Sequence, residues 1–252
     1  MRVATVLEPT KVSNIEPVLT PSNGKAEVPP LQSGDRLSRA EFERRYRLHP
    51  EIKKAELIEG EVYVASAVQF KRHGYPHFNM IGWLGSYCAA TPFVSGADNA
   101  TVRLDLENEP QPDVLLRLDE EVGGRSWITE DDYLEGSLEL VVEIAASSAS
   151  YDLGKKKRVY ARNGVQEYIV FVAYEKQVYW FALGEEGYEA LAPDENGMIR
   201  SQIFPGLWLQ AEVLRTDNLA QVLNGLQAGL ASPEHAAFVE TLMQRAEQKK
   251  QA

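Results

Sequence analysis

The sequence has little cysteine and no long apolar run. Cys88 is the single cysteine among 252 residues, which excludes an internal disulfide framework and a cysteine-based zinc site. No apolar stretch approaches membrane-spanning length, and residues 1–17 lack the apolar core of a signal peptide. These absences predict a protein of the reducing cytoplasm without a membrane segment.

Basic side chains are in the minority. The chain has 26 Lys and Arg against 37 Asp and Glu, a net charge of −11. An acidic chain does not coat nucleic acid indiscriminately, although a local basic groove is compatible with this charge. A Gly-rich phosphate loop, a Ser-His-Asp series and a zinc signature are also missing from the sequence. The apolar content of 44% is ordinary for a globular protein.

Composition divides the chain into three parts. Residues 1–34 are rich in Pro, Ser, Thr and Asn and have no apolar period, so we expect a flexible N-terminal arm. Helix and strand patterns fill residues 35–215 and predict one α/β domain, a central mixed β-sheet flanked by helices. Residues 216–252 contain two helical patterns, which we expect to form a C-terminal extension.

Local patterns identify several elements. Ser38 and Glu41 form a capping box that begins a helix. Residues 55–66 are typical of a hairpin whose turn is Glu59-Gly60. The acidic, Gly-containing stretch 119–136 predicts a loop.

A helix is expected from Tyr75 to Thr91. Its spacing places Phe78, Ile81, Leu84 and Cys88 on one face, which we expect to be the buried one.

Two acidic residues lie where their neighbours are apolar. Asp113 follows a proline, which cannot continue a strand ladder, so Asp113 is expected at the mouth of an apolar strand. Glu143 lies inside LVVEIA, residues 140–145, whose continuous apolar character predicts a central strand covered on both faces. A carboxylate in such a strand is costly unless a positive group pairs with it.

A lysine cluster follows on the next helix. Leu153, Lys156 and Tyr160 share one helical face by three- and four-residue spacing, and that face must turn toward the sheet. Lys155 points to the opposite, solvent side. We therefore expect Lys156 to meet Glu143, although an ion pair of this kind can also be purely structural.

Two carboxylates on neighbouring strands suit a magnesium or manganese ion, because both metals prefer oxygen ligands. Such a metal polarises a phosphodiester and acidifies a water molecule. A nearby lysine can orient that water or offset developing negative charge. Acid, acid, metal and lysine together predict phosphodiester cleavage.

The ordered series Pro-Asp, distal Glu in an apolar strand and then Lys resembles the PD-(D/E)XK nuclease superfamily. More closely, the chain is similar to a large bacterial family described as putative restriction endonucleases. The matching stretches are ELIEGEV, QPDVLL, LVVEIAASS and DLGKKKRVYARNGVQEYIVF, which lie within residues 37–214. The resemblance implies a restriction-endonuclease-like fold and a metal-dependent endonuclease that hydrolyses DNA phosphodiester bonds.

The resemblance also implies roles for individual residues. Asp113 and Glu143 would be catalytic metal ligands for Mg²⁺ or Mn²⁺, and the carbonyl of Ile144 would add a third ligand. Lys156 would be the catalytic lysine, which the closer family carries on the helix after the Glu strand. In the wider superfamily the lysine stands two residues after the second acid, and that position is Ala145 here.

Three further residues are candidate auxiliary residues by the same resemblance: Glu56, His77 and Gln111. The usual Ser-Pro-Ser loop after the Glu strand is altered here to Ser147-Ser148-Ala149. DNA is the expected partner, and a homodimer is expected by analogy with the superfamily.

Two other readings stay open. The chain could keep the nuclease fold as a catalytically inactive binding or regulatory module, which the acidic charge, the altered loop and Ala145 favour. It could also be an unrelated sheet protein whose acid-lysine cluster is structural. Asp113 and Glu143 lying far apart would favour the last reading.

Overall fold

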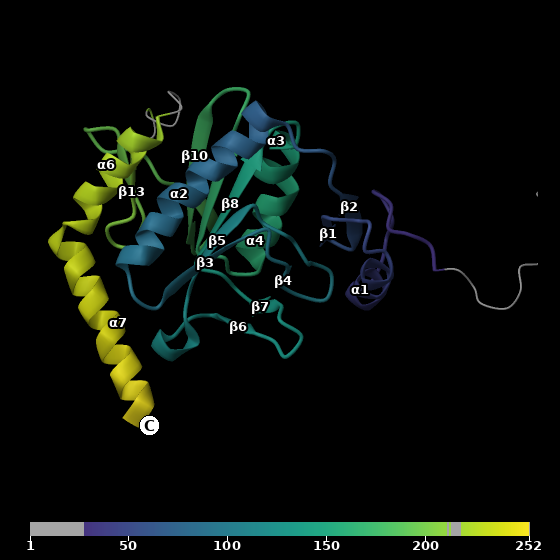
Figure 1. Cartoon of the computed structure of the whole chain (residues 1–252), viewed down its shortest axis with the longest axis horizontal. Helices are drawn as coiled ribbons and strands as arrows, with labels where there is room; N and C mark the ends of the chain where they lie inside the picture. The colour runs from purple at the N-terminus through teal and green to yellow at the C-terminus, as the bar shows by residue number, and fades with distance from the viewer. Residues whose placement is uncertain (1–27, 211, 213–217, 252) are drawn as a thin grey trace, which may run out of the picture.

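A mixed six-stranded sheet is the centre of the computed structural model, which describes residues 28–210, 212 and 218–251 (Figure 1). In order across the sheet, the strands are β11 (Gly187–Ala190), β10 (Gln177–Gly184), β9 (Glu167–Val172), β8 (Leu140–Ala145), β5 (Val114–Leu118) and β3 (Val94–Asp98). Strands β8 and β9 pair in parallel, and the other neighbours pair antiparallel. The predicted α/β class with a central mixed sheet is confirmed.

Helices cover both faces of this sheet (Figure 1). One face carries the helices α2 (Tyr75–Ala90), α6 (Leu219–Leu230) and α7 (Pro233–Gln251), together with the strand pair β12 (Met198–Arg200) and β13 (Trp208–Gln210). The other face carries one continuous helical segment, made of α3 (Ala149–Tyr151), the π-helical turn η3 (Asp152–Lys156) and α4 (Lys157–Arg162). The sheet is therefore buried on both sides, which explains the continuous apolar character of β8.

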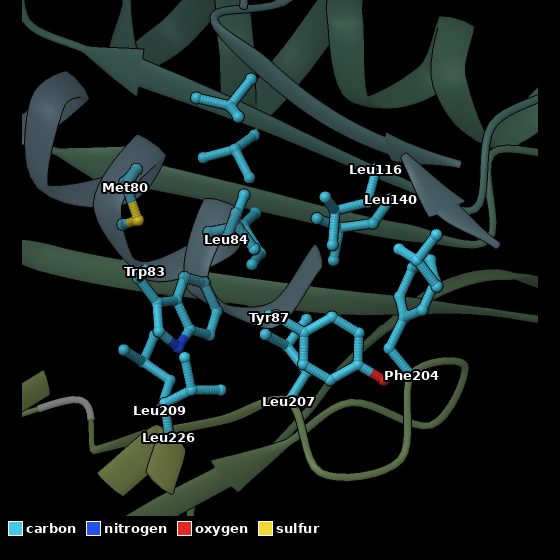
Figure 2. Packing of buried hydrophobic residues seen from close by; sticks show 14 of the residues in the cluster. Met80, Trp83, Leu84, Tyr87, Leu116, Leu140, Phe204, Leu207, Leu209 and Leu226 are labelled. Carbon is cyan, nitrogen blue, oxygen red and sulfur yellow. The ribbon is translucent and has the colours of Figure 1, made fainter. Parts of the chain in front are cut away.

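The larger core lies between the sheet and α2 (Figure 2). The helix contributes Met80, Trp83, Leu84 and Tyr87, each at most 1% exposed. These side chains pack with Leu116 and Leu140 of the sheet and with Leu226 of α6, among others. Because α6 and α7 both contribute buried leucines, they stabilise this face of the sheet.

The predicted buried face of α2 is wrong in part. Phe78 is 65% exposed, and Ile81 and Cys88 are only partly buried, so Leu84 alone of the predicted four lies fully in the core. The helix is apolar around most of its circumference, so three- and four-residue spacing fits two neighbouring stripes equally well. The stripe that contains Trp83 is the one that faces the sheet.

The predicted first helix and hairpin are present at one side of the sheet (Figure 1). Helix α1 (Arg39–Leu48) begins after Ser38, whose hydroxyl accepts a hydrogen bond from the Glu41 amide. Strands β1 (Ala55–Ile58) and β2 (Glu61–Val64) form the hairpin. Both turn residues have positive φ, +54° at Glu59 and +69° at Gly60, as a tight two-residue hairpin turn requires.

The stretch 119–136 is not a plain loop. It contains a short 3₁₀ turn, η2 (Glu120–Val122), and two short strands, β6 (Ser126–Ile128) and β7 (Leu134–Gly136). Together with β4 (Val102–Arg103) these strands form a small three-stranded sheet. The expected loop is corrected here, because strands of three residues are too short to show an alternating pattern.

The predicted division into three parts stays a prediction. Residues 1–27 of the expected N-terminal arm lie outside the described residues. The remainder of that stretch contacts the hairpin, because the Gly34 amide donates to the Val62 carbonyl at 2.9 Å and Leu31 is buried. Among the described residues, no helix combines the length and the hydrophobicity that a bilayer crossing demands.

Candidate active site

The alternation of side chains along β8 turns Glu143 away from the larger core. Val142 packs under α2, whereas Val141 and Ala145 pack on the opposite face together with Tyr160 of α4. Side chains two residues apart share a face of a strand, so Glu143 points to the face that carries α4. The inward-facing helix and the buried acid therefore meet on the same side of the sheet.

Asp113 reaches the same face from the neighbouring strand. In the antiparallel pairing of β5 with β8, Val114 lies opposite Val142 and Leu115 opposite Val141. One step further along this register, Asp113 falls opposite Glu143. The Asp113 Oδ2 atom also accepts a hydrogen bond from the Ile144 amide at 2.8 Å. The two acids are thus brought together, as the sequence predicts.

Lys156 lies between three carboxylates. Its Nζ atom is 2.9 Å from Glu143 Oε1, 2.8 Å from Glu56 Oε1 and 4.0 Å from Asp152 Oδ1. The hydroxyl of Tyr160 donates to the same Glu143 oxygen at 2.8 Å. Only 3% of Lys156 is exposed, so its charge is balanced by buried acids rather than by water.

The hairpin brings Glu56 into this cluster. Leu57 of β1 exchanges two backbone hydrogen bonds with Glu109, which holds the hairpin against the segment that leads to β5. The Gln111 amide then donates to Glu56 Oε1 at 2.8 Å. The side chain of Gln111 donates to Thr101 and lines a neighbouring cavity, so this predicted auxiliary residue contributes its backbone to the cluster.

Two histidines and a second lysine surround Asp113. His77, the predicted auxiliary residue, donates from Nε2 to the Asp113 carbonyl at 2.7 Å and not to the carboxylate. The ring of His73 lies between two oxygens, with Nε2 3.4 Å from Asp113 Oδ1 and Nδ1 3.1 Å from the Ile144 carbonyl. Lys54 Nζ donates to Asp113 Oδ1 at 2.9 Å.

Sequence reasoning missed Lys54, His73 and Asp152, and it placed Tyr160 on the inward helical face without predicting its hydrogen bond to Glu143. Periodicity contains a signal for all of these except His73. Lys54 stands two residues before Glu56 and therefore on the same side of an extended chain. Asp152 and Tyr160 stand four residues before and after Lys156, on the same helical face.

One lysine differs from its predicted position. Lys155 was expected on the solvent side, but it is half-buried and donates to Glu61 at 2.9 Å and to the Tyr63 hydroxyl at 3.0 Å. It therefore binds the outer strand of the hairpin, because β2 lies beside the helical segment. Only Lys156 of the cluster reaches the acids of the sheet.

Lys156 and His73, two of the basic residues that face the acids, stand on π-helical turns. In η3 the Lys157 amide donates to the carbonyl of Asp152, five residues earlier. In η1 (Phe70–Gly74), which carries His73, the Gly74 amide donates to the Gln69 carbonyl, again five residues earlier. A π turn changes the helical register locally and is frequent at functional sites.

Burial and charge act in opposite directions on Asp113. Burial alone would raise its pKa, but the hydrogen bond with His73 and the charge of Lys54 hold the pKa well below its usual range. The same hydrogen bond raises the pKa of His73. Burial would lower the pKa of Lys54, but Asp113 and two further acids hold it above its usual value. Asp113 is therefore an anion beside cations.

Glu143 behaves in the opposite way. Its burial raises the pKa, with Asp113 and Glu56 adding to the rise and Lys156 opposing it. The pKa of Lys156 stays well above its usual value, because the charges of Glu143 and Glu56 outweigh its own burial. Two carboxylates on adjacent strands with separated pKa values form a site in which one acid is ionised and the other retains a proton more readily.

The cluster opens into a cleft of about 390 Å³. Side chains of Lys54, Asp113 and Glu143 line this cleft, as does the exposed ring of Tyr174. The cleft is bordered by the loop after β8, by the start of β1 and by the segment before α2. Charged groups of both signs in one cleft suit a polar or anionic ligand.

The site contains carboxylate and carbonyl oxygens, the type of ligand that magnesium and manganese bind. Among the described residues, no group of three or more His, Cys, Asp or Glu side chains is arranged to hold a metal ion. Magnesium, however, is commonly held by one or two carboxylates with water and substrate completing its shell. The ring of His73 lies between the Asp113 carboxylate and the Ile144 carbonyl, so a basic side chain already stands between two of the predicted ligands. The donor set therefore fits magnesium or manganese, provided that this ring moves aside.

Fold and site together define an α/β protein with a buried acid-lysine centre at the edge of a cleft. A family model described as Uma2, putative restriction endonuclease, matches residues 39–212. The chain belongs to this family, as the sequence resemblance predicts. No curated protein matches the sequence significantly.

A solved structure also matches the chain: a putative nuclease belonging to DUF820 from Anabaena variabilis ATCC 29413. It shares 11% sequence identity with this chain at a TM-score of 0.46. The match covers 68% of this chain and 90% of that chain.

Proposed function

We propose that the chain is a metal-dependent endonuclease that hydrolyses DNA phosphodiester bonds in the cleft beside Asp113 and Glu143. The observation that supports this most strongly is the placement of both acids on one face of adjacent strands, with a lysine between the sheet and the following helix. Membership in a family of putative restriction endonucleases supports the same reaction class.

The proposed metal is magnesium or manganese, held by Asp113, Glu143 and the Ile144 carbonyl. When bound, it would supply a polarised phosphoryl oxygen and a more acidic water. In the overall reaction the water oxygen bonds to phosphorus and the bond from phosphorus to the leaving sugar oxygen breaks. The two hydrogens of water end on the new phosphate and on the released hydroxyl.

The side chains around the acids would hold those acids in position. Lys156 holds Glu143 and Glu56 at fixed positions, and Tyr160 fixes the shared Glu143 oxygen.

Replacing Glu143 by glutamine tests the proposal. The change preserves the shape of the side chain and removes its negative charge, so cleavage of plasmid DNA with Mg²⁺ or Mn²⁺ should fall below detection. Glu61→Gln on the outer hairpin strand is the matched control and should leave cleavage at the wild-type rate. Cleavage by Glu143→Gln at the rate of this control would rule out the assignment, provided that both variants are folded by circular dichroism.

A second candidate is a non-catalytic binding or regulatory module with the same fold. The specific observation that favours it is the engagement of the predicted ligands by the chain's own cations, Lys54 and His73 on Asp113 and Lys156 on Glu143. Titration calorimetry with MnCl₂ separates the two candidates. Heat of binding at millimolar metal supports the nuclease, and its absence at those concentrations favours the module.

DNA as substrate and a homodimeric state are parts of the proposal that need their own measurements. Cleavage assays with matched duplex DNA, single-stranded DNA and RNA would identify the substrate. Sedimentation velocity would give the oligomeric state.

A further inference from the structure

The site contains two lysines whose surroundings differ. Lys156 is buried, and its ammonium contacts Glu56 and Glu143 at 2.8 and 2.9 Å, with Asp152 at 4.0 Å on the same group. An ammonium group has three N–H donors; two of them lie within hydrogen-bond distance of Glu56 and Glu143, and Asp152 lies nearby at 4.0 Å. A phosphate entering the cleft would have to displace a buried carboxylate to reach it.

Lys54 has a different environment. Both lysines line the cleft, but the side chain of Lys54 is 25% exposed, whereas that of Lys156 is 4% exposed. The Lys54 ammonium donates to Asp113 Oδ1 at 2.9 Å and to Asn99 Oδ1 at 2.8 Å, which uses two of its three N–H groups. Lys54 therefore has one further N–H group that can donate to a ligand, and it is accessible to solvent beside Asp113, which precedes β5.

The position of Lys54 follows from the hairpin. It precedes Ala55 of β1, two residues before Glu56, so both charged side chains turn toward the sheet while Ala55 packs into the small core under α1. Lys53, one residue earlier, turns the other way and donates to the Pro50 carbonyl at the surface. The two neighbouring lysines thus differ in one respect, the side of the chain they occupy.

We propose that Lys54 is the catalytic lysine that contacts the phosphodiester, and that Lys156 is a positioning residue that holds Glu56 and Glu143 without touching substrate. This inference rests on the proposed nuclease function and deepens it. Lys54 keeps its protons throughout hydrolysis. Its ammonium donates to a non-bridging phosphoryl oxygen and offsets the negative charge that develops there as one P–O bond forms and another breaks.

The inference reverses the role that the sequence resemblance assigns to Lys156. A lysine enclosed by acids stabilises those acids, whereas a lysine at the cleft can exchange Asn99 or Asp113 for a phosphate oxygen. After this exchange Asp113 still accepts the hydrogen bond from the Ile144 amide.

The test compares Lys54→Met with Lys53→Met, Lys54→Arg and Lys156→Met in the full chain. Cleavage of plasmid DNA with Mg²⁺ gives the rates, and thermal unfolding gives the stability of each variant. Metal-free binding of a fluorescent 20-base-pair duplex between about 50 and 200 mM KCl gives the salt dependence of affinity, a readout independent of catalysis.

Lys54→Met should cleave about 100-fold more slowly, as expected for the loss of one donor to the transition state. Its slope of log affinity against log salt should fall by about 0.9, the value for one phosphate contact. Its melting temperature should stay near that of wild type. Lys54→Arg should recover part of the rate, and Lys53→Met should match wild type in all three measurements. Lys156→Met should melt earlier and keep the wild-type salt slope.

Results that overturn the role of Lys54 can be distinguished from results that overturn the nuclease proposal. If wild type and Lys54→Met cleave alike, the role of Lys54 is overturned while the nuclease proposal stands. If Lys54→Met loses cleavage but keeps the wild-type salt slope and melts as early as Lys156→Met, Lys54 is structural and the inference is again wrong. If wild type cleaves no DNA with either Mg²⁺ or Mn²⁺, the proposed function fails and the inference fails with it.

Discussion

Replacing Lys156 by methionine removes a buried charge and little volume. The Nζ atom lies 2.8 Å from Glu56 Oε1 and 2.9 Å from Glu143 Oε1, and 3% of the residue is exposed. At an effective dielectric constant of about 20, each contact corresponds to roughly 6 kcal/mol of attraction. Desolvation of the ammonium offsets several kcal/mol of this sum. Since the acids would remain buried without their cation, the free energy of unfolding should fall by about 3–5 kcal/mol.

Urea unfolding at pH 9, above the raised pKa of Glu143, measures this loss, because Glu143 is then ionised in the folded chain. The indole rings of Trp83 and Trp180 are buried in the larger core, so tryptophan fluorescence reports its disruption. With a denaturant slope of about 2–3 kcal/mol per molar urea, the midpoint should move down by about 1–2 M. Lys155→Met is the matched control, because that lysine and its partner Glu61 both stay partly exposed to solvent, and it should cost less than about 1 kcal/mol.

A second change separates charge from packing. In Lys156→Met combined with Glu143→Gln, one of the two stranded charges is gone, so part of the lost stability should return. A cost for Lys156→Met no larger than that of Lys155→Met would refute the reasoning, since the buried acids would then not depend on the lysine. Full additivity of the two changes would also contradict it.

Two further predictions concern pH and packing. Burial raises the pKa of Glu143 from its ordinary 4.5 to about 8, so the folded wild type binds a proton that the unfolded chain releases between these values. Wild type should therefore lose stability relative to Glu143→Gln as pH rises from 4.5 to 8, by up to about 1.4 kcal/mol per pH unit, and a pH-independent difference in urea unfolding would contradict this sign. In α6, Gly229→Ala would place a Cβ 2.1 Å from the Gly206 carbonyl oxygen and should lower the melting temperature sharply. Gly225→Ala in the same helix meets only a flexible side chain at 3.5 Å and should raise stability by up to about 1 kcal/mol; equal melting temperatures would show that the backbone contact does not matter.

Glu143 and Lys156 could be paired from the sequence because both lie on elements with strong patterns. The apolar strand contains one charged residue, and the helical spacing leaves one lysine on the inward face. The register between β5 and β8 is not a local property. That Asp113 falls opposite Glu143, rather than one residue to either side, therefore needed the structure.

Lys54 was missed because its surroundings are non-local. A lysine before a short strand is most simply a surface residue. Its contact with Asp113 joins positions 59 residues apart and exists because the hairpin packs against the approach to β5. The same reasoning accounts for Phe78, whose exposure depends on which side of an almost wholly apolar helix meets the sheet.

Strand β8 serves two layers with alternate residues. Val142 and Ile144 belong to the hydrophobic layer under α2, and Glu143 between them belongs to the polar layer of the cleft. Inserting or deleting one residue within the strand would turn each following side chain to the other face of the sheet and place the carboxylate in the hydrophobic core. Conservative substitutions in this strand are tolerated, but a change in its length is not. We therefore expect insertions and deletions in relatives to occur in the flanking loops and to be absent from residues 140–145.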